Sequence, residues 1–109
     1  MSSGGHLASL LGTSGGERDL EGVKGNTEQS SKVMAVCDWC GFVDFEHISK
    51  KGWNQQSVLY KLFKGPQDCK QTEIRLASRM EFASSDDPPF LIMHGDKDRT
   101  VSIRQSENF

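Results

Sequence analysis

Two short segments of this 109-residue chain combine residue types and spacings that could support nucleophilic chemistry. The first is Ser2-Ser3-Gly4-Gly5, which precedes a run of helical spacing, and a Ser-x-Gly directly before a helix is the second half of G-x-S-x-G. That motif turns a strand sharply into a helix and exposes the serine oxygen at the helix N-terminus, where backbone N–H groups favour negative charge. Either Ser2 or Ser3 fits as the nucleophile, and the same residues also suit an ordinary flexible linker.

The second segment is a short apolar run, residues 90–94, that ends in His-Gly-Asp-Lys-Asp. Functional groups of open α/β sheets gather at the carboxyl ends of the strands, and a carboxylate there can orient a histidine. The same spacing also suits a structural interpretation, in which Asp96 and Asp98 are turn and N-cap residues before a helix starting near Ile103.

Metal or redox chemistry has weaker support. Cys37 and Cys40 form a C-x-x-C, but the second pair that a structural zinc site needs is missing, and Cys69 and His47 stand at unsuitable spacings. A redox C-x-x-C is the alternative, and ordinary thiols are the simplest interpretation. Acidic residues over 96–107 partly fit a calcium loop, yet valine stands where the sharp turn requires glycine. We therefore expect no metal site.

The first chemical segment needs a helix directly behind it, and the spacing predicts one over residues 4–12. Its leucines recur at i, i+3 and i+4, which defines one apolar face: Leu7, Leu10 and Leu11. Gly12 fits a C-terminal helix stop.

The remaining elements alternate between strands and helices. Residues 33–37 and 90–94 are short, apolar runs without alternation, which is typical of parallel strands buried on both faces. Residues 55–78 show helical spacing with breaks, and a further helix begins near Ile103. This order predicts an α/β fold with a parallel sheet.

Composition excludes several partners. The formal net charge is −2 and the pI is about 5.9, so nothing electrostatic favours nucleic acid or an anionic membrane. The longest apolar run, residues 33–37, has five residues, whereas a membrane span needs about 20. No signal-peptide pattern opens the chain. The length suits one modest domain.

The chain resembles the α/β-hydrolase fold serine esterases and lipases related to bacterial acetyl- and feruloyl-type esterases. Residues 2–14 resemble the elbow and following helix of that family, and residues 36–45 resemble its Val-Val-Asp-Trp-Phe-Gly-Pro-Thr-Asp-Phe segment. Residues 62–66 and 77–78 are similar to its Leu-Leu-Gly-Gly-Pro and Ala-Ser-Pro segments. Residues 86–98 match most closely, with Asp-Asp-Pro-Pro-Phe-Leu-Ile-x-His-Gly-Asp-x-Asp almost intact. The resemblance covers the whole chain in the same order.

This resemblance implies that residues 1–109 are a partial α/β-hydrolase domain, a fragment of a serine esterase that hydrolyses carboxylic esters through an acyl-enzyme. It makes Ser2 the nucleophile, the backbone N–H of Ser3 an oxyanion donor, and Asp98 the acid of the catalytic triad. It implies a small-molecule ester as substrate and no cofactor. A serine peptidase of the prolyl-oligopeptidase kind and a non-catalytic binding fragment are the alternatives.

The departures from the family pattern predict an incomplete enzyme. The first elbow glycine, the preceding strands and the second oxyanion loop would lie before Met1, and the catalytic histidine would lie after Phe109. None of the three histidines stands at its position: His6, His47 and His94. We therefore expect a truncated product, or a reading frame begun at an internal methionine, that folds poorly and has no esterase activity alone. Phe42 and Arg79 replace prolines of the family, which should cost turn rigidity.

Overall fold

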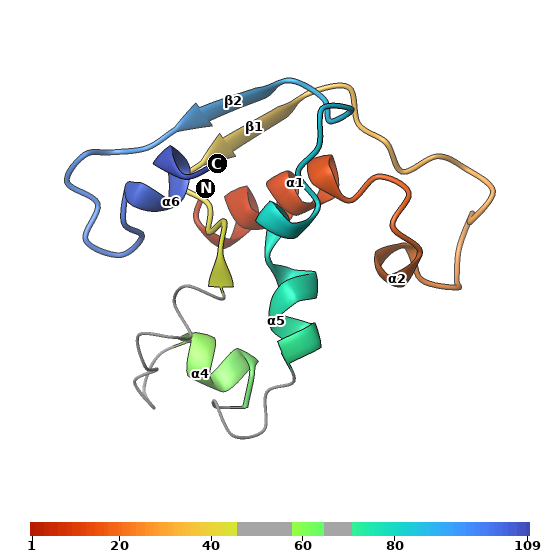
Figure 1. Ribbon diagram of the computed structural model, residues 1–109, viewed down its shortest axis with the longest axis horizontal. Helices are drawn as coiled ribbons and strands as arrows, with labels where there is room; N and C mark the ends of the chain where they lie inside the picture. Colours follow the sequence, from red (N-terminus) through yellow and green to blue (C-terminus); the bar gives the residue numbers. More distant parts are fainter. Residues whose placement is uncertain (46–57, 65–70) are drawn as a thin grey trace.

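The computed structural model describes residues 1–45, 58–64 and 71–109, in which two parallel strands lie over a set of helices (Figure 1). The predictions that concern His47, Cys69, residues 55–57 and residues 65–70 lie outside these described ranges. The elements in chain order are α1 (Ser3–Thr13), α2 (Arg18–Glu21), β1 (Val36–Trp39), α4 (Val58–Leu62), α5 (Gln71–Ala77), the 3₁₀ turn η1 (Arg79–Glu81), β2 (Phe90–Met93) and α6 (Arg104–Glu107).

The two strands pair in parallel, with Val36 opposite Phe90 and Trp39 opposite Met93. The first strand was expected at residues 33–37, and the structure places it three residues later. The reason lies in the partner strand, because the Pro88-Pro89 pair precedes β2 and has no N–H to donate to a ladder. The ladder therefore begins where the Val36 N–H donates to the Pro89 carbonyl at 3.0 Å.

Helix α1 covers one face of this sheet, and it does so with small residues (Figure 1). Its buried residues are Gly5, Ser9, Gly12 and Thr13. The leucine face expected from the sequence points elsewhere, since Leu7 is 63% exposed and Leu11 is 47% exposed. A Cβ on Gly12 would lie 2.8 Å from Cζ of Phe90, so the helix approaches the strands more closely than a leucine face would allow.

The expected helix stop at Gly12 is wrong, because this glycine lies where α1 packs closely against the strands. Gly12 lies within α1, which continues to Thr13 and ends where the Ser14 N–H donates to the Leu10 carbonyl at 2.9 Å. The Thr13 hydroxyl also bonds back to the Ser9 carbonyl at 3.2 Å. The glycine is therefore used for close packing rather than for termination.

The opposite face of the sheet is uncovered by the described residues, which corrects the expectation of strands buried on both faces. Along β1 burial alternates, with Val36 and Asp38 buried and Cys37 and Trp39 exposed. Leu91, the register partner of Cys37, is 58% exposed. Cys37, Trp39 and Leu91 thus form a contiguous apolar surface, here named the open sheet face.

A second group of apolar side chains lies between the end of β1 and the helical segment. Phe45, Phe63 and Ile74 are buried together, and Leu59 and Ala77 pack against them. Within the predicted helical stretch 55–78, the structure describes α4 and α5, and Ile74 points inward as its spacing indicates.

The loop after β1 is fixed by side chains from distant elements. The buried Gln105 of α6 accepts hydrogen bonds from the N–H groups of Val43 and Asp44, at 2.9 and 3.0 Å. The Ser78 hydroxyl accepts one from the Phe45 N–H at 3.1 Å and donates to the Ile74 carbonyl at 2.8 Å. These bonds hold the loop between the carboxyl end of β1 and the helices.

No helix in the described ranges is long and apolar enough to cross a membrane.

Candidate functional site

Ser2 has the backbone conformation of a strained turn at the start of α1. Its φ is 51° and its ψ is −122°, a combination that costs a non-glycine residue about 1–3 kcal/mol. Its N–H donates to the carbonyl of Trp39, the last residue of β1, at 2.9 Å. The His6 N–H donates to the Ser2 carbonyl at 2.9 Å and begins the helical hydrogen bonding. The half-buried serine therefore lies at the carboxyl end of the sheet, on the turn that leads into the helix.

Ser3 is the first residue of α1, and its N–H donates to no acceptor among the described residues. The first N–H groups of a helix lack intrahelical partners and carry partial positive charge. An N–H without a partner next to Ser2 is the kind of group that can stabilise negative charge.

Asp98 lies on the loop that follows β2. Its Oδ1 accepts hydrogen bonds from the N–H groups of Thr100 and Val101, at 2.7 and 3.0 Å. These two backbone donors, Val101 first, lower the pKa of the Asp98 carboxyl, and the nearby His94 ring adds to the effect. The turn interpretation of Asp98 is thus correct for one oxygen, whereas α6 has no side-chain N-cap. The second oxygen, Oδ2, accepts no hydrogen bond from the described residues and lies near the His94 ring.

His94 is engaged locally, as its position at a strand end indicated. Its Nδ1 lies 2.7 Å from the Ser106 hydroxyl, and its Nε2 lies 2.9 Å from the Val101 carbonyl. Its side chain is only 3% exposed, and Nε2 is 3.6 Å from Oδ2 of Asp98. With both ring nitrogens bonded, His94 ties the end of β2 to α6 and to the Asp98 loop.

The serine turn borders a cavity of about 500 Å³, and Asp98 itself is not among the residues that line it. Ser2, Ser3 and His6 of the α1 start line it, together with Thr100, which follows Asp98 by two residues. The other walls are apolar and come from the loop after β1 and from the helices: Phe42, Phe45, Leu59, Leu62 and Ala77. A serine, a free N–H and the loop of a carboxylate thus border a mostly apolar hollow.

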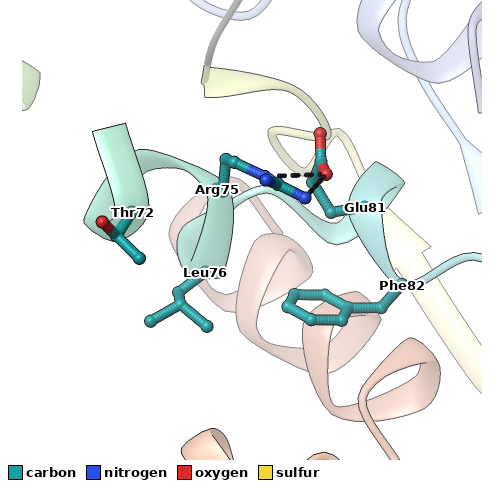
Figure 2. Close-up of a pocket in the computed structure, with 5 residues that line it drawn as sticks. All are labelled: Thr72, Arg75, Leu76, Glu81 and Phe82. Atoms are coloured by element: carbon teal, nitrogen blue, oxygen red, sulfur yellow. Dashed lines mark hydrogen bonds and ion pairs between the residues drawn. The ribbon is translucent and has the colours of Figure 1, made fainter. Parts of the chain in front are cut away.

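A second hollow, of about 120 Å³, lies between α5 and η1 and holds none of the sequence-predicted residues. Figure 2 shows the Arg75 guanidinium pointing at the Glu81 carboxylate, with Leu76 and Phe82 on the near wall. The ion pair measures 2.9 Å, and the side chains are 62% and 31% exposed. Its charged groups satisfy each other at the surface.

Metal binding receives no support from the described part of the chain, where no cluster of three or more His, Cys, Asp or Glu side chains is positioned to hold an ion. Cys37 is exposed, Cys40 is buried, and both are free thiols. Cys69 and His47 lie outside the described residues.

A buried ion pair beneath the serine turn has no counterpart in the sequence-based expectations. Nη1 of Arg79 lies 2.7 Å from Oδ2 of Asp38, and both side chains are 0% exposed. Oδ1 of Asp38 accepts from the Gly41 N–H at 2.9 Å, and the guanidinium carbon lies 4.2 Å from the ring centre of Phe109. Burial lowers the pKa of Arg79, and Asp38 opposes that shift.

Both replacements of family prolines therefore do more than loosen turns. Arg79 supplies the cation of the buried pair. Phe42 lines the cavity and stacks on Phe45, with ring centres 5.6 Å apart. The one local signal for the pair was an aspartate inside an apolar strand, since a buried charge requires a partner.

A parallel sheet with helices, together with a sharp turn at Ser2 on its carboxyl edge, matches part of the α/β-hydrolase fold. The BD-FAE family model matches residues 1–109, so the chain belongs to the BD-FAE family. A curated relative, the probable carboxylic ester hydrolase LipM of Mycobacterium tuberculosis (strain ATCC 25618 / H37Rv), is 27% identical over 110 residues, covering 99% of this chain and 25% of that protein. The chain thus spans about a quarter of that relative.

Solved structures of esterases share this fold. A bifunctional GH43-CE protein of Bacteroides eggerthii matches with a TM-score of 0.85 and 32% identity, over 100% of this chain and 16% of that chain. A truncated carbohydrate esterase from gut microbiota matches with a TM-score of 0.78 and 35% identity, over 99% of this chain and 42% of that chain.

Proposed function

We propose that this chain carries the nucleophile and the acid of a serine carboxylic ester hydrolase, with Ser2 as nucleophile, the Ser3 N–H as oxyanion donor and Asp98 as triad acid. The observation that carries the proposal is the positive φ of Ser2 at a turn bonded to the last carbonyl of β1. Strain of that kind persists where a reactive side chain must project from a sharp turn. The names of the relatives, which are ester hydrolases, agree with the reaction class.

In the proposed reaction, the hydroxyl oxygen of Ser2 attacks the ester carbonyl and its proton passes to a histidine. The carbonyl oxygen becomes an oxyanion that accepts from the Ser3 N–H, and the tetrahedral intermediate expels the alcohol, which takes the proton from that histidine. Oδ2 of Asp98 orients the histidine, while its Oδ1 is fixed by the Thr100 and Val101 N–H groups. Water then releases the carboxylic acid by the reverse proton path.

The 109-residue chain alone should lack this activity, because neither described histidine is hydrogen-bonded to both Ser2 and Asp98. His94 has both ring nitrogens bonded, and His6 uses Nδ1 on the Phe42 carbonyl at 3.1 Å. Loss of the base in a serine hydrolase costs about 10⁶-fold in kcat.

The test replaces the matching segment of the related gut carbohydrate esterase with this chain and measures hydrolysis of p-nitrophenyl acetate. Ser2→Ala should reduce kcat by about 10⁶-fold, and the matched Ser3→Ala should retain activity because it keeps the backbone N–H. Loss of activity in Ser3→Ala with retention in Ser2→Ala would move the nucleophile by one residue. Retention in both would end the proposal. The unaltered 109-residue chain, assayed alongside, should be inactive and unlabelled by a fluorophosphonate.

A further inference from the structure

His6 lies one helical turn from Ser2 and borders the same cavity, yet the proposed reaction gives it no role. Its N–H donates to the Ser2 carbonyl at 2.9 Å, which fixes the two residues relative to each other. Ser2 and His6 both line the hollow of about 500 Å³. The His6 side chain is half-buried.

The His6 ring is held in one orientation. Its Nδ1 lies 3.1 Å from the Phe42 carbonyl oxygen, and since a carbonyl can only accept, Nδ1 carries the hydrogen. The Phe45 ring packs edge-on against the imidazole, with centres 4.9 Å apart and planes at 86°. A neutral imidazole protonated at Nδ1 presents an unprotonated Nε2, which is a hydrogen-bond acceptor.

That Nε2 atom is unused within the described residues. It has no hydrogen-bond partner there, and it is not among the buried polar atoms, so it remains open to solvent. The cavity walls from Phe42, Phe45 and the helices are apolar. An acceptor held rigidly beside an apolar hollow is the kind of group that orients a bound ligand.

The surroundings keep the ring uncharged near neutral pH. Burial lowers the pKa of His6, and the Arg79 guanidinium of η1 lowers it further. The Phe42 carbonyl and the Asp38 carboxylate of β1 act in the opposite direction without reversing the shift.

We propose that His6 is a substrate-positioning residue, whose Nε2 accepts a hydrogen bond from a hydroxyl group on the alcohol part of the ester bound in this cavity. This deepens the proposed esterase function and rests on it. The ester group itself has no O–H to donate, and the donor in this proposal is a free hydroxyl elsewhere on the molecule. A bare lone pair also repels a carboxylate, so the same atom discriminates against acid groups.

The test measures binding of two matched probes to the 109-residue chain carrying Ser2→Ala, which removes the proposed chemistry. Benzyl alcohol has an aromatic ring and one O–H, and benzyl methyl ether has the same ring without a donor. One hydrogen bond should make the alcohol bind about five- to tenfold more tightly, as followed by NMR titration. His6→Phe should abolish this preference, whereas Thr100→Val, on the same cavity, should keep it.

A second readout needs no change at His6. As pH falls through the His6 pKa, Nε2 gains a proton and can no longer accept, so the preference for the alcohol should disappear. The ¹⁵N shifts of the ring should place the neutral-state proton on Nδ1. A preference that survives His6→Phe, or one that is unchanged at low pH, or absence of binding by both probes, would overturn the proposal. These outcomes are independent of the hydrolysis assay, which tests Ser2 separately.

Discussion

Replacing Gly5 by alanine tests whether close contact between α1 and β1 holds the serine turn. A Cβ at this position would lie 2.8 Å from the Trp39 carbonyl oxygen and 3.1 Å from the Gly41 nitrogen, and closer still to Oδ1 of Asp38. Two of these atoms are backbone, and the carboxylate is fixed by Arg79 and by the Gly41 N–H. None can move cheaply, so the start of α1 must shift away from the strand.

The neighbouring Gly4 provides the matched control, because a Cβ there would meet nothing within 4 Å. Alanine exceeds glycine in helix propensity by up to about 1 kcal/mol, so Gly4→Ala should stabilise the chain slightly. Gly5→Ala gains the same propensity but suffers overpacking of about 1–3 kcal/mol, which makes it destabilising. Gly12→Ala should fall between them, since its obstacles are side chains of Val36 and Phe90.

The assay is urea unfolding followed by far-UV circular dichroism, with trimethylamine N-oxide present to strengthen burial. The free energies of unfolding of Gly4→Ala and Gly5→Ala should differ by about 2 kcal/mol, with midpoints about 1 M apart for a typical urea dependence. Alanine at Gly5 should also weaken the bond between Ser2 N–H and Trp39, visible as faster amide exchange at Ser2. If both alanines moved the midpoint equally in one direction, the close-contact argument would be wrong.

Three further predictions concern charge and exposed surface. Arg79→Met should lower the free energy of unfolding by about 3–5 kcal/mol, because it leaves the Asp38 carboxylate buried without a partner. Adding Asp38→Asn should restore part of that free energy. If the effects of the two substitutions simply added in urea unfolding, the pairing would be contradicted. Because the pKa of Asp98 is lowered, its contribution to loop stability is present above the ordinary carboxyl pKa and is lost as pH falls through the lower, folded-state pKa. Protection of the Thr100 amide against exchange should fall over that pH window. Constant protection would refute this prediction. Leu91→Thr should reduce binding of a hydrophobic dye to the open sheet face. Val23→Thr should not, since Val23 is 92% exposed but lies apart in a loop. Equal effects of the two substitutions would show that the open sheet face is not the cause of dye binding.

Local signals predicted the turn at Ser2 and the strand before Asp98 better than the contacts between elements. The serine before a helical run and the aspartates after an apolar run depend on residues a few positions apart, and the structure has a strained turn at Ser2 and a parallel strand before Asp98. The face of α1 could not be inferred in this way. Leucine periodicity identifies an apolar side, but the helix lies on the sheet through Gly5 and Gly12, because only glycine allows the approach that the serine turn requires.

Long-range partners were the other part that the sequence could not specify. Asp38 and Arg79 are far apart in the chain, and the sequence around either residue does not identify the other as its partner. Gln105 shows no local sign of its bonds to the N–H groups of Val43 and Asp44. Such partners depend on which loops the fold brings together, whereas local pattern indicates only that a buried polar group must have one.

The strained backbone of Ser2 must be offset by favourable contacts nearby, and the described ones come from β1. Its N–H is bound to Trp39 on β1, and Asp38 of the same strand holds the Gly41 N–H against the start of α1. Strand β1 in turn pairs with β2, whose following loop carries Asp98. One strand therefore links the positive φ of the serine to the loop of the carboxylate. A change that separates α1 from β1 should consequently relax the serine turn and widen the cavity at the same time, rather than altering either one alone.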